Sequence, residues 1–126
     1  YKPEVKKVLT AKDIVELQTL VRTIPVSDYL VEYTVRLVSA TRPVNNAPDF
    51  VKKYIRWGAG PRASQYLILA AKTFAALDGR PTPSVNDVKR VILPVLRHRI
   101  VRSFNAEAEG ITADEIIKYV AQFLKE

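Results

Sequence analysis

Helix signals recur along the whole chain, and they constrain the fold more than any other feature. Five segments each begin at a residue favoured as a helix N-cap and continue with apolar residues three and four positions apart. No segment alternates apolar and polar residues for long, so strands are not predicted. With 126 residues, 48% of them hydrophobic, the chain can bury one sizeable core. We therefore predict an all-α fold, a small helical bundle of about five helices.

The first two predicted helices follow each other closely. Thr10 caps a helix that reaches about Thr23, Pro25 stops it, and Ser27 caps the second helix. The prolines and asparagines of residues 41–49 predict a loop, and residues 50–57 a short helical or irregular run. One buried stripe is expected on each helix: Ile14, Leu17, Val21 and Ile24 on the first, and Leu30, Thr34, Leu37 and Val38 on the second.

Three further helices are predicted after residue 60. One begins at Pro61 and ends before Gly79, which stands where a glycine is favoured after a helix. Another begins after Ser84 and is expected to kink or restart at Pro94, and the last begins with a capping box at Thr112. The inward-facing residues are expected to be Ala63, Leu67, Ala70, Ala71, Phe74 and Leu77; Val88, Val91, Ile92 and Val95; and Ile116, Ile117, Val120, Phe123 and Leu124.

An arginine follows directly on the start of the third predicted helix. Gly58 and Gly60 give the backbone freedom and close approach, Gly60 is the expected N-cap, and Pro61 sets a helical φ. Arg62 is then the second helical residue, where the helix dipole disfavours a cation by roughly 0.3–1 kcal/mol. A phosphate held by backbone N–H groups and the guanidinium would reverse that sign. The alternative is that Arg62 bends away into water.

The composition excludes several classes of site. Cysteine is absent, which removes disulfides and thiolate chemistry, and a single histidine excludes His clusters, so no metal site is predicted. No apolar run approaches the ~20 residues that a membrane span requires. The net charge of +7 suits nucleic acid, phosphate or an acidic partner equally well. Because the sequence starts at Tyr1 without Met, we expect a piece of a longer protein. The expected location is the cytoplasm.

The chain offers little for catalysis. It has no phosphate loop of the form G-x-x-x-x-G-K-[ST] and no acidic pair after an apolar strand. His98 stands between Arg97 and Arg99, which disfavour its protonated form, so a partly buried polar contact is favoured over a catalytic role. We predict no catalytic residue in the chain. Three acids are interpreted as first-turn acids of helices rather than as a carboxylate pair: Asp13, Asp87 and Asp114.

Several motifs follow one another along the chain: WGAGPRASQ at 57–65, ALDGR at 76–80, VNDVK at 85–89, LPVLRHR at 93–99 and EAEGITAD at 107–114. Their order and spacing resemble the C-terminal lid of MoxR-type AAA+ ATPases, and residues 9–18 and 25–28 also fit the start of that lid. The similarity covers nearly the whole chain after residue 5. Gly60 stands where many relatives carry Ser, and both residues are acceptable N-caps.

This resemblance implies a role for Arg62. It matches the sensor 2 arginine, which reaches from the lid to the γ-phosphate of ATP, while Gly60, Pro61 and Ala63 shape the helix start. Residues 1–9 would be a linker from an upstream ATPase core, and residues 10–126 the helical lid. ATP and Mg²⁺ would bind mainly through that core, so the chain alone is not expected to be an enzyme or to hold a cofactor tightly.

The resemblance also implies partners. They are the ATPase core itself, neighbouring subunits in a hexameric ring, and von Willebrand factor A-domain proteins, in a chaperone-like remodelling machine driven by lid rotation. Arg97, His98 and Arg99 are candidates for contacts with the core or the next subunit, the alternative being a solvated basic helix end. For Trp57, core packing is favoured over a contact beside adenine.

A second class of function stays open, a small basic helical domain that binds nucleic acid through the helix after Ser84. The basic residues of that segment are sparse on one face, and no aromatic platform alternates with them. Nucleic acid is therefore the less favoured partner.

Overall fold

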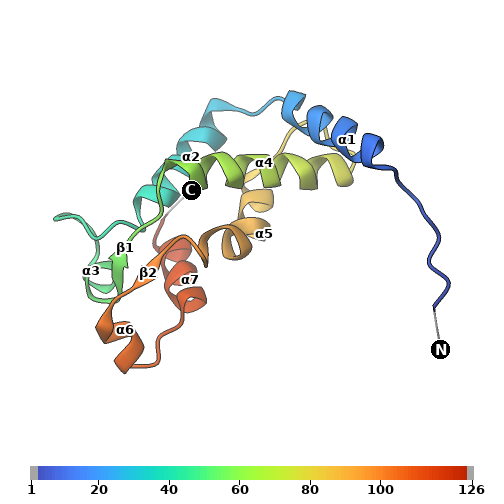
Figure 1. The fold of residues 1–126 in the computed structure, drawn as a ribbon. Coiled ribbons are helices and arrows are strands. Elements are labelled where there is room, and N and C mark those ends of the chain that lie inside the picture. Colours follow the sequence, from blue (N-terminus) through green and yellow to red (C-terminus); the bar gives the residue numbers. More distant parts are fainter. Residues whose placement is uncertain (1–2, 125–126) are drawn as a thin grey trace.

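The computed structural model describes residues 3–124, which form seven α-helices and one pair of short β-strands (Figure 1). The predicted all-α bundle is confirmed, and the five longest helices are the five predicted ones. The predicted segments 1–9 and 10–126 include residues 1–2 and 125–126, which lie outside the described residues. The elements are α1 (Ala11–Thr23), α2 (Asp28–Ser39), α3 (Asp49–Tyr54), β1 (Ile55–Trp57), α4 (Pro61–Leu77), α5 (Val85–Leu96), β2 (Val101–Arg102), α6 (Phe104–Ala108) and α7 (Ala113–Phe123).

Side-chain caps begin most of these helices, as predicted. The hydroxyl of Thr10 caps α1 in a capping box, Ser27 caps α2, and Thr112 caps α7 in a second box. At α5 the carboxylate of Asp87 accepts hydrogen bonds from the N–H of Ser84 at 2.8 Å and from its hydroxyl at 3.1 Å. These caps satisfy N–H groups that have no partner within the helix, so the start of each helix is fixed locally.

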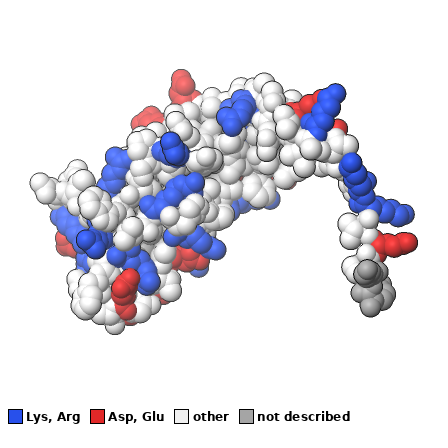
Figure 2. Space-filling model, viewed as in Figure 1, with Lys and Arg blue, Asp and Glu red and all other residues white. Residues whose placement is uncertain are grey.

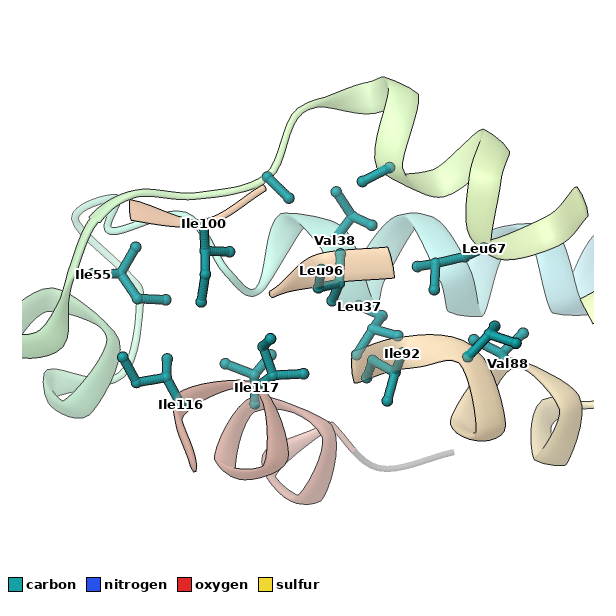
Figure 3. Packing of buried hydrophobic residues seen from close by; sticks show 14 of the residues in the cluster. Leu37, Val38, Ile55, Leu67, Val88, Ile92, Leu96, Ile100, Ile116 and Ile117 are labelled. Carbon is teal, nitrogen blue, oxygen red and sulfur yellow. The ribbon is translucent and has the colours of Figure 1, made fainter. Parts of the chain in front are cut away.

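The hydrophobic core forms around α4, which packs against α1, α2 and α5. Ala63, Ala71 and Ala75 are fully buried, and their small side chains let neighbouring helices approach α4 closely. Side chains from α2, α4, α5 and α7 meet beneath α4 (Figure 3). The residues labelled there are Leu37, Val38, Ile55, Leu67, Val88, Ile92, Leu96, Ile100, Ile116 and Ile117.

The predicted buried stripe on α1 is wrong. None of its residues is buried, and Ile14 and Leu17 are 47% and 46% exposed. Periodicity shows that a helix has an apolar face but not what covers that face, and α1 packs chiefly on α4 at the edge of the bundle (Figure 1). Leu77 and Phe123 are also exposed, because each lies in the last turn of its helix, beyond the core.

Several other inward positions are half-buried at the border of the core rather than inside it: Ala70, Phe74, Val95 and Leu124. Leu30, Thr34, Leu37 and Val38 are buried, which confirms the stripe on α2.

Pro94 does not restart the helix, so of the kink or restart expected there the restart is wrong. α5 continues through it to Leu96, and the N–H of Arg97 still bonds the carbonyl of Leu93 at 3.0 Å. Proline removes one N–H donor, but so close to the helix end that loss leaves the preceding turns intact.

The β1–β2 pair was not predicted. Ile55 pairs with Arg102 and Trp57 with Val101 in antiparallel register, with an irregularity between the two pairs. Strands of two and three residues are too short for an alternating pattern to show. The pair ties the chain before α4 to the segment after α5.

Candidate functional site

The loop between β1 and α4 is held by the end of α2. A Cβ added to Gly58 would lie 2.5 Å from the carbonyl oxygen of Thr41 and 2.7 Å from the Cα of Arg42, so a side chain does not fit there. The hydroxyl of Thr41 donates to the carbonyl of Val38 at 2.6 Å and accepts from the N–H of Ala59 at 2.9 Å. Nε of Arg42 donates to the carbonyl of Ala59 at 3.2 Å. Both backbone polar groups of Ala59 are therefore bonded to α2's end.

The start of α4 follows the prediction in its residues but lacks a cap. Gly60 is the N-cap with φ −88° and ψ 175°, and Pro61 is the first helical residue. An added Cβ at Gly60 would meet nothing within 4 Å, so neither space nor φ requires glycine there. No side chain caps this helix, and no acidic residue stands in its first turn.

Arg62 is the second residue of α4, and its side chain is exposed. Within residues 3–124 it forms no hydrogen bond or ion pair through its guanidinium. Its neighbour Ala63 is 1% exposed, so the backbone beside the arginine is fixed by the core. A cation without a partner thus stands at the positive end of a helix, held by a rigid backbone.

A second arginine lies on the same side of α4. Tyr66 follows Arg62 by one helical turn, so the two residues share a face. The guanidinium carbon of Arg99 lies 4.9 Å from the centre of the Tyr66 ring, and Arg99 also donates to the carbonyl of Val95. Nε2 of His98 contacts the guanidinium of Arg99, which confirms the expected polar contact, but His98 is exposed, so the partial burial expected for it is wrong.

Arg97 points to a different partner. Its Nε and one terminal nitrogen donate to the two carboxylate oxygens of Asp114, at 3.1 Å and 2.9 Å. This pair joins the end of α5 to the first turn of α7. The structure therefore separates Arg97 from its two neighbours, and contacts of the three residues with another domain or subunit stay a prediction.

Trp57 is not part of the core, so the packing expected for it is wrong. Its side chain is 66% exposed, and Val101, which faces it across the strand pair, is 50% exposed. Ile55 takes the inward position on β1 instead, at 2% exposure. The irregular register between Ile55 and Trp57 breaks the alternation of the strand at this point.

A charged cluster that the sequence analysis missed surrounds Asp87, which is 2% exposed. Arg80 donates to both its carboxylate oxygens, at 2.9 Å and 2.6 Å, and also to Asp78. These bonds, followed by those from Ser84, lower the pKa of Asp87 to about 2 although burial opposes the shift. The motif of Ser84 and Asp87 was visible in the sequence, but Arg80 reaches it only through the turn after α4. The cluster lies at the opposite end of α4 from Arg62.

Charges of both signs are mixed over the face in view, where basic side chains over α3, β1 and β2 have acidic ones among them (Figure 2). In the described part of the chain, no group of three or more His, Asp or Glu side chains is arranged to hold a metal ion. No helix within residues 3–124 is long and apolar enough to cross a membrane.

Comparison with known proteins gives consistent matches. The family model described as AAA lid domain matches residues 49–120. The chain is similar to Chaperone MoxR1 of Mycobacterium tuberculosis, with 39% identity over 95% of this chain and 32% of that protein. It is also similar to Protein MoxR of Paracoccus denitrificans, with 43% identity over 40% of this chain and 15% of that protein.

A solved structure is similar along most of the chain. It is the crystal structure of a protein from Cytophaga hutchinsonii that is provisionally described as an ATPase, with a TM-score of 0.84 and 32% identity. The match covers 90% of this chain and 35% of that one. The chain therefore spans about a third of the length of MoxR1 and of the solved protein.

Proposed function

The chain belongs to the AAA lid domain family, and from that premise we propose that it is the C-terminal lid of a MoxR-type AAA+ ATPase, with Arg62 as its sensor 2 arginine. The lid closes over ATP that an ATPase core binds, and Arg62 contacts the γ-phosphate. Closing and opening of the lid then couple hydrolysis to chaperone-like remodelling.

One observation carries this proposal: Arg62 is exposed at the uncapped start of α4 and has no partner among residues 3–124. A γ-phosphate would turn the unfavourable contact between the arginine and the helix dipole into a favourable one. The guanidinium can bind two phosphate oxygens at once, and such contacts strengthen as charge develops on a transferring phosphoryl group. Pro61 and the buried Ala63 support this role because they fix the backbone on either side.

The remaining parts of the machine lie with other domains and subunits. We infer that ATP and Mg²⁺ bind mainly to the ATPase core, in the cytoplasm, and that the chain alone neither binds nucleotide tightly nor hydrolyses it. The assembly is a ring, with six subunits as in related machines, and von Willebrand factor A-domain proteins are candidate partners. His98 and Arg99 are the members of the basic motif that bond no carboxylate in the described residues, which makes them candidates for contacts with the core or a neighbouring subunit.

The test measures ATP hydrolysis by a protein in which this chain is joined to its ATPase core. Arg62→Ala is expected to lower kcat by about a hundredfold or more, and Arg62→Lys to restore activity only in part because an ammonium cannot bind two oxygens in one plane. Lys118→Ala is the control, since Lys118 is also an exposed cation but lies on α7, which packs on α3 and α5 away from the start of α4. A folded Arg62→Ala protein with the wild-type rate would contradict the proposal.

A separate measurement concerns the chain by itself. The purified chain should show no ATP turnover, and ATP should leave its melting temperature nearly unchanged because weak binding stabilises little. ATP turnover by the purified chain would mean that the chain contains catalytic groups of its own, which would contradict this part of the proposal.

A further inference from the structure

We propose that Thr41, in the turn directly after α2, is a positioning residue for Arg62. The inference rests on the proposed function of Arg62 and adds a residue to it. Thr41 does not touch the expected phosphate position. It acts through Ala59, which precedes the N-cap of α4 by one residue and Arg62 by three.

The hydrogen bonds around Ala59 show how the loop is held. Ala59 is fully buried, its N–H donates to the Thr41 hydroxyl at 2.9 Å, and its carbonyl accepts from Arg42 at 3.2 Å. Gly58 lies so close to the backbone of Thr41 and Arg42 that a Cβ does not fit between them. These contacts fix the position and the orientation of the backbone just before α4 relative to the end of α2.

The start of α4 depends on this contact more than other helix starts do. No side chain caps α4, so the direction in which Arg62 leaves the helix depends on Pro61, on the buried Ala63 and on the contacts that hold the loop before them. A phosphate contact by two parallel hydrogen bonds needs that direction to be right. A displacement of about 1 Å at a distance from the chemistry can lower a rate by about a hundredfold.

The hydroxyl of Thr41 is the chemical group required. It is fully buried, accepts from Ala59 and donates to the carbonyl of Val38 at 2.6 Å, so it joins the loop to the last turn of α2. Valine has the same shape but can neither accept nor donate. In Thr41→Val the N–H of Ala59 loses its partner in a buried place, and the loop must shift to satisfy it.

The experiment uses the ATP-hydrolysing protein that contains this chain, and Thr34 supplies a matched control. Thr34 is also fully buried on α2, but its hydroxyl donates to the carbonyl of Leu30 within the same helix. Thr41→Val should lower kcat by about tenfold to a hundredfold, with a much smaller change in KM, whereas Thr34→Val should leave kcat nearly unchanged. Thr41→Ser, which keeps the hydroxyl, should retain most of the activity.

A double mutant separates positioning from general damage. If Thr41 acts through Arg62, Thr41→Val should have no further effect on kcat once Arg62 is Ala. The same factor in both backgrounds, or equal losses in Thr41→Val and Thr34→Val, would overturn the positioning role and leave the role of Arg62 intact. A wild-type rate in Arg62→Ala alone would instead overturn the proposed function.

A milder variant keeps the test decisive if Thr41→Val does not fold. Arg42→Lys removes the Nε donor to Ala59 but keeps the charge, and the side chain is only half-buried. It should lower kcat in the same way but less, and again only while Arg62 is present. A normal kcat in Arg42→Lys, together with a failure of Thr41→Val to fold, would count against positioning.

Discussion

The starts of α4 and α5 both combine a helix N-terminus with an arginine, but they arrange the two in opposite ways. At α5 the carboxylate of Asp87 accepts hydrogen bonds from the N–H of Ser84 and from both terminal nitrogens of Arg80. The charges of Asp87 and Arg80 are therefore paired within the domain. At α4 the N-cap is a glycine, the first turn has no acid, and Arg62 has no charged partner in the described residues. The difference separates a start that stabilises the fold from one that is left available for an outside anion.

The two starts also differ in what holds them. α5 is fixed by its own cap, whereas α4 is fixed from outside by the end of α2. A helix start with its own acidic cap would compete with a bound phosphate for the same N–H groups. Support from a neighbouring helix avoids that competition, because it leaves the first turn free.

The largest expected effect on stability comes from breaking the ion pair at the start of α5. Asp87→Asn removes the charge that faces Arg80 in a buried place and should lower the free energy of unfolding by about 2–4 kcal/mol. Asp114→Asn is the control, since Asp114 also accepts two hydrogen bonds from an arginine but its side chain is 39% exposed; it should cost less than about 1 kcal/mol. Urea denaturation measures both, and equal losses would show that burial does not distinguish the two pairs.

Acid should weaken the same start. The pKa of Asp87 is lowered to about 2 in the folded protein, so the folded state binds fewer protons than the unfolded state. Its contribution, about 2 kcal/mol, is fully present above about pH 4 and is lost as the pH falls from about 4 towards 2. The acid limb of stability against pH should be shallower in Asp87→Asn. Three other carboxylates with lowered pKa values lie outside this cluster and contribute equally in both proteins: Asp13, Glu109 and Glu115. The pKa of Asp78 is also lowered, but Asp78 shares Arg80 with Asp87, so its contribution changes with the substitution. Parallel acid limbs would contradict this assignment.

The contact that holds the loop before α4 can be broken without changing Arg62. Gly58→Ala places a Cβ against the backbone of Thr41 and should destabilise the chain by about 1–3 kcal/mol. Gly60→Ala is the matched control: its Cβ meets open space and its φ is ordinary, so the expected loss is smaller, about 1 kcal/mol or less, from the poorer N-cap. Thermal melting distinguishes the two, and a larger loss at Gly60 would mean that the loop is held differently.

The smallest expected effect on stability comes from placing an acidic residue in the first turn of α4. Arg62→Glu in the chain alone should raise the free energy of unfolding by about 0.5–1 kcal/mol, because an anion is favoured at the positive end of the helix. Arg36→Glu, in the last turn of α2, should have the opposite sign. A loss of stability in Arg62→Glu would show that the arginine stabilises the fold after all.

The sequence predicted most of the fold because caps and helical spacing are local signals. Thr10, Ser27 and Thr112 marked helix starts correctly, and Arg62 was placed correctly as the second residue of α4. What it could not predict depends on distant contacts. The bare apolar face of α1 and the exposed Trp57 depend on what covers them, which periodicity and residue type do not record.

The candidate site shows the same division. The glycines before α4 were recognised, but only the structure distinguishes Gly58, which must be glycine, from Gly60, which need not be. The hydroxyl of Thr41 meets Ala59 across 18 positions of sequence, and no local pattern relates the two residues.

The low burial of α1 has a consequence for its local stability. α1 buries none of its side chains, and a bond from Nζ of Lys72 to the carbonyl of Arg22, at 3.2 Å, helps to hold its last turn on α4. α2, by contrast, contributes five buried residues to the core. Amide protons of α1 should therefore exchange with solvent through local opening that is insensitive to denaturant, while those of α2 exchange only when the whole domain unfolds. We therefore expect the first helix to open and close while the other helices stay folded.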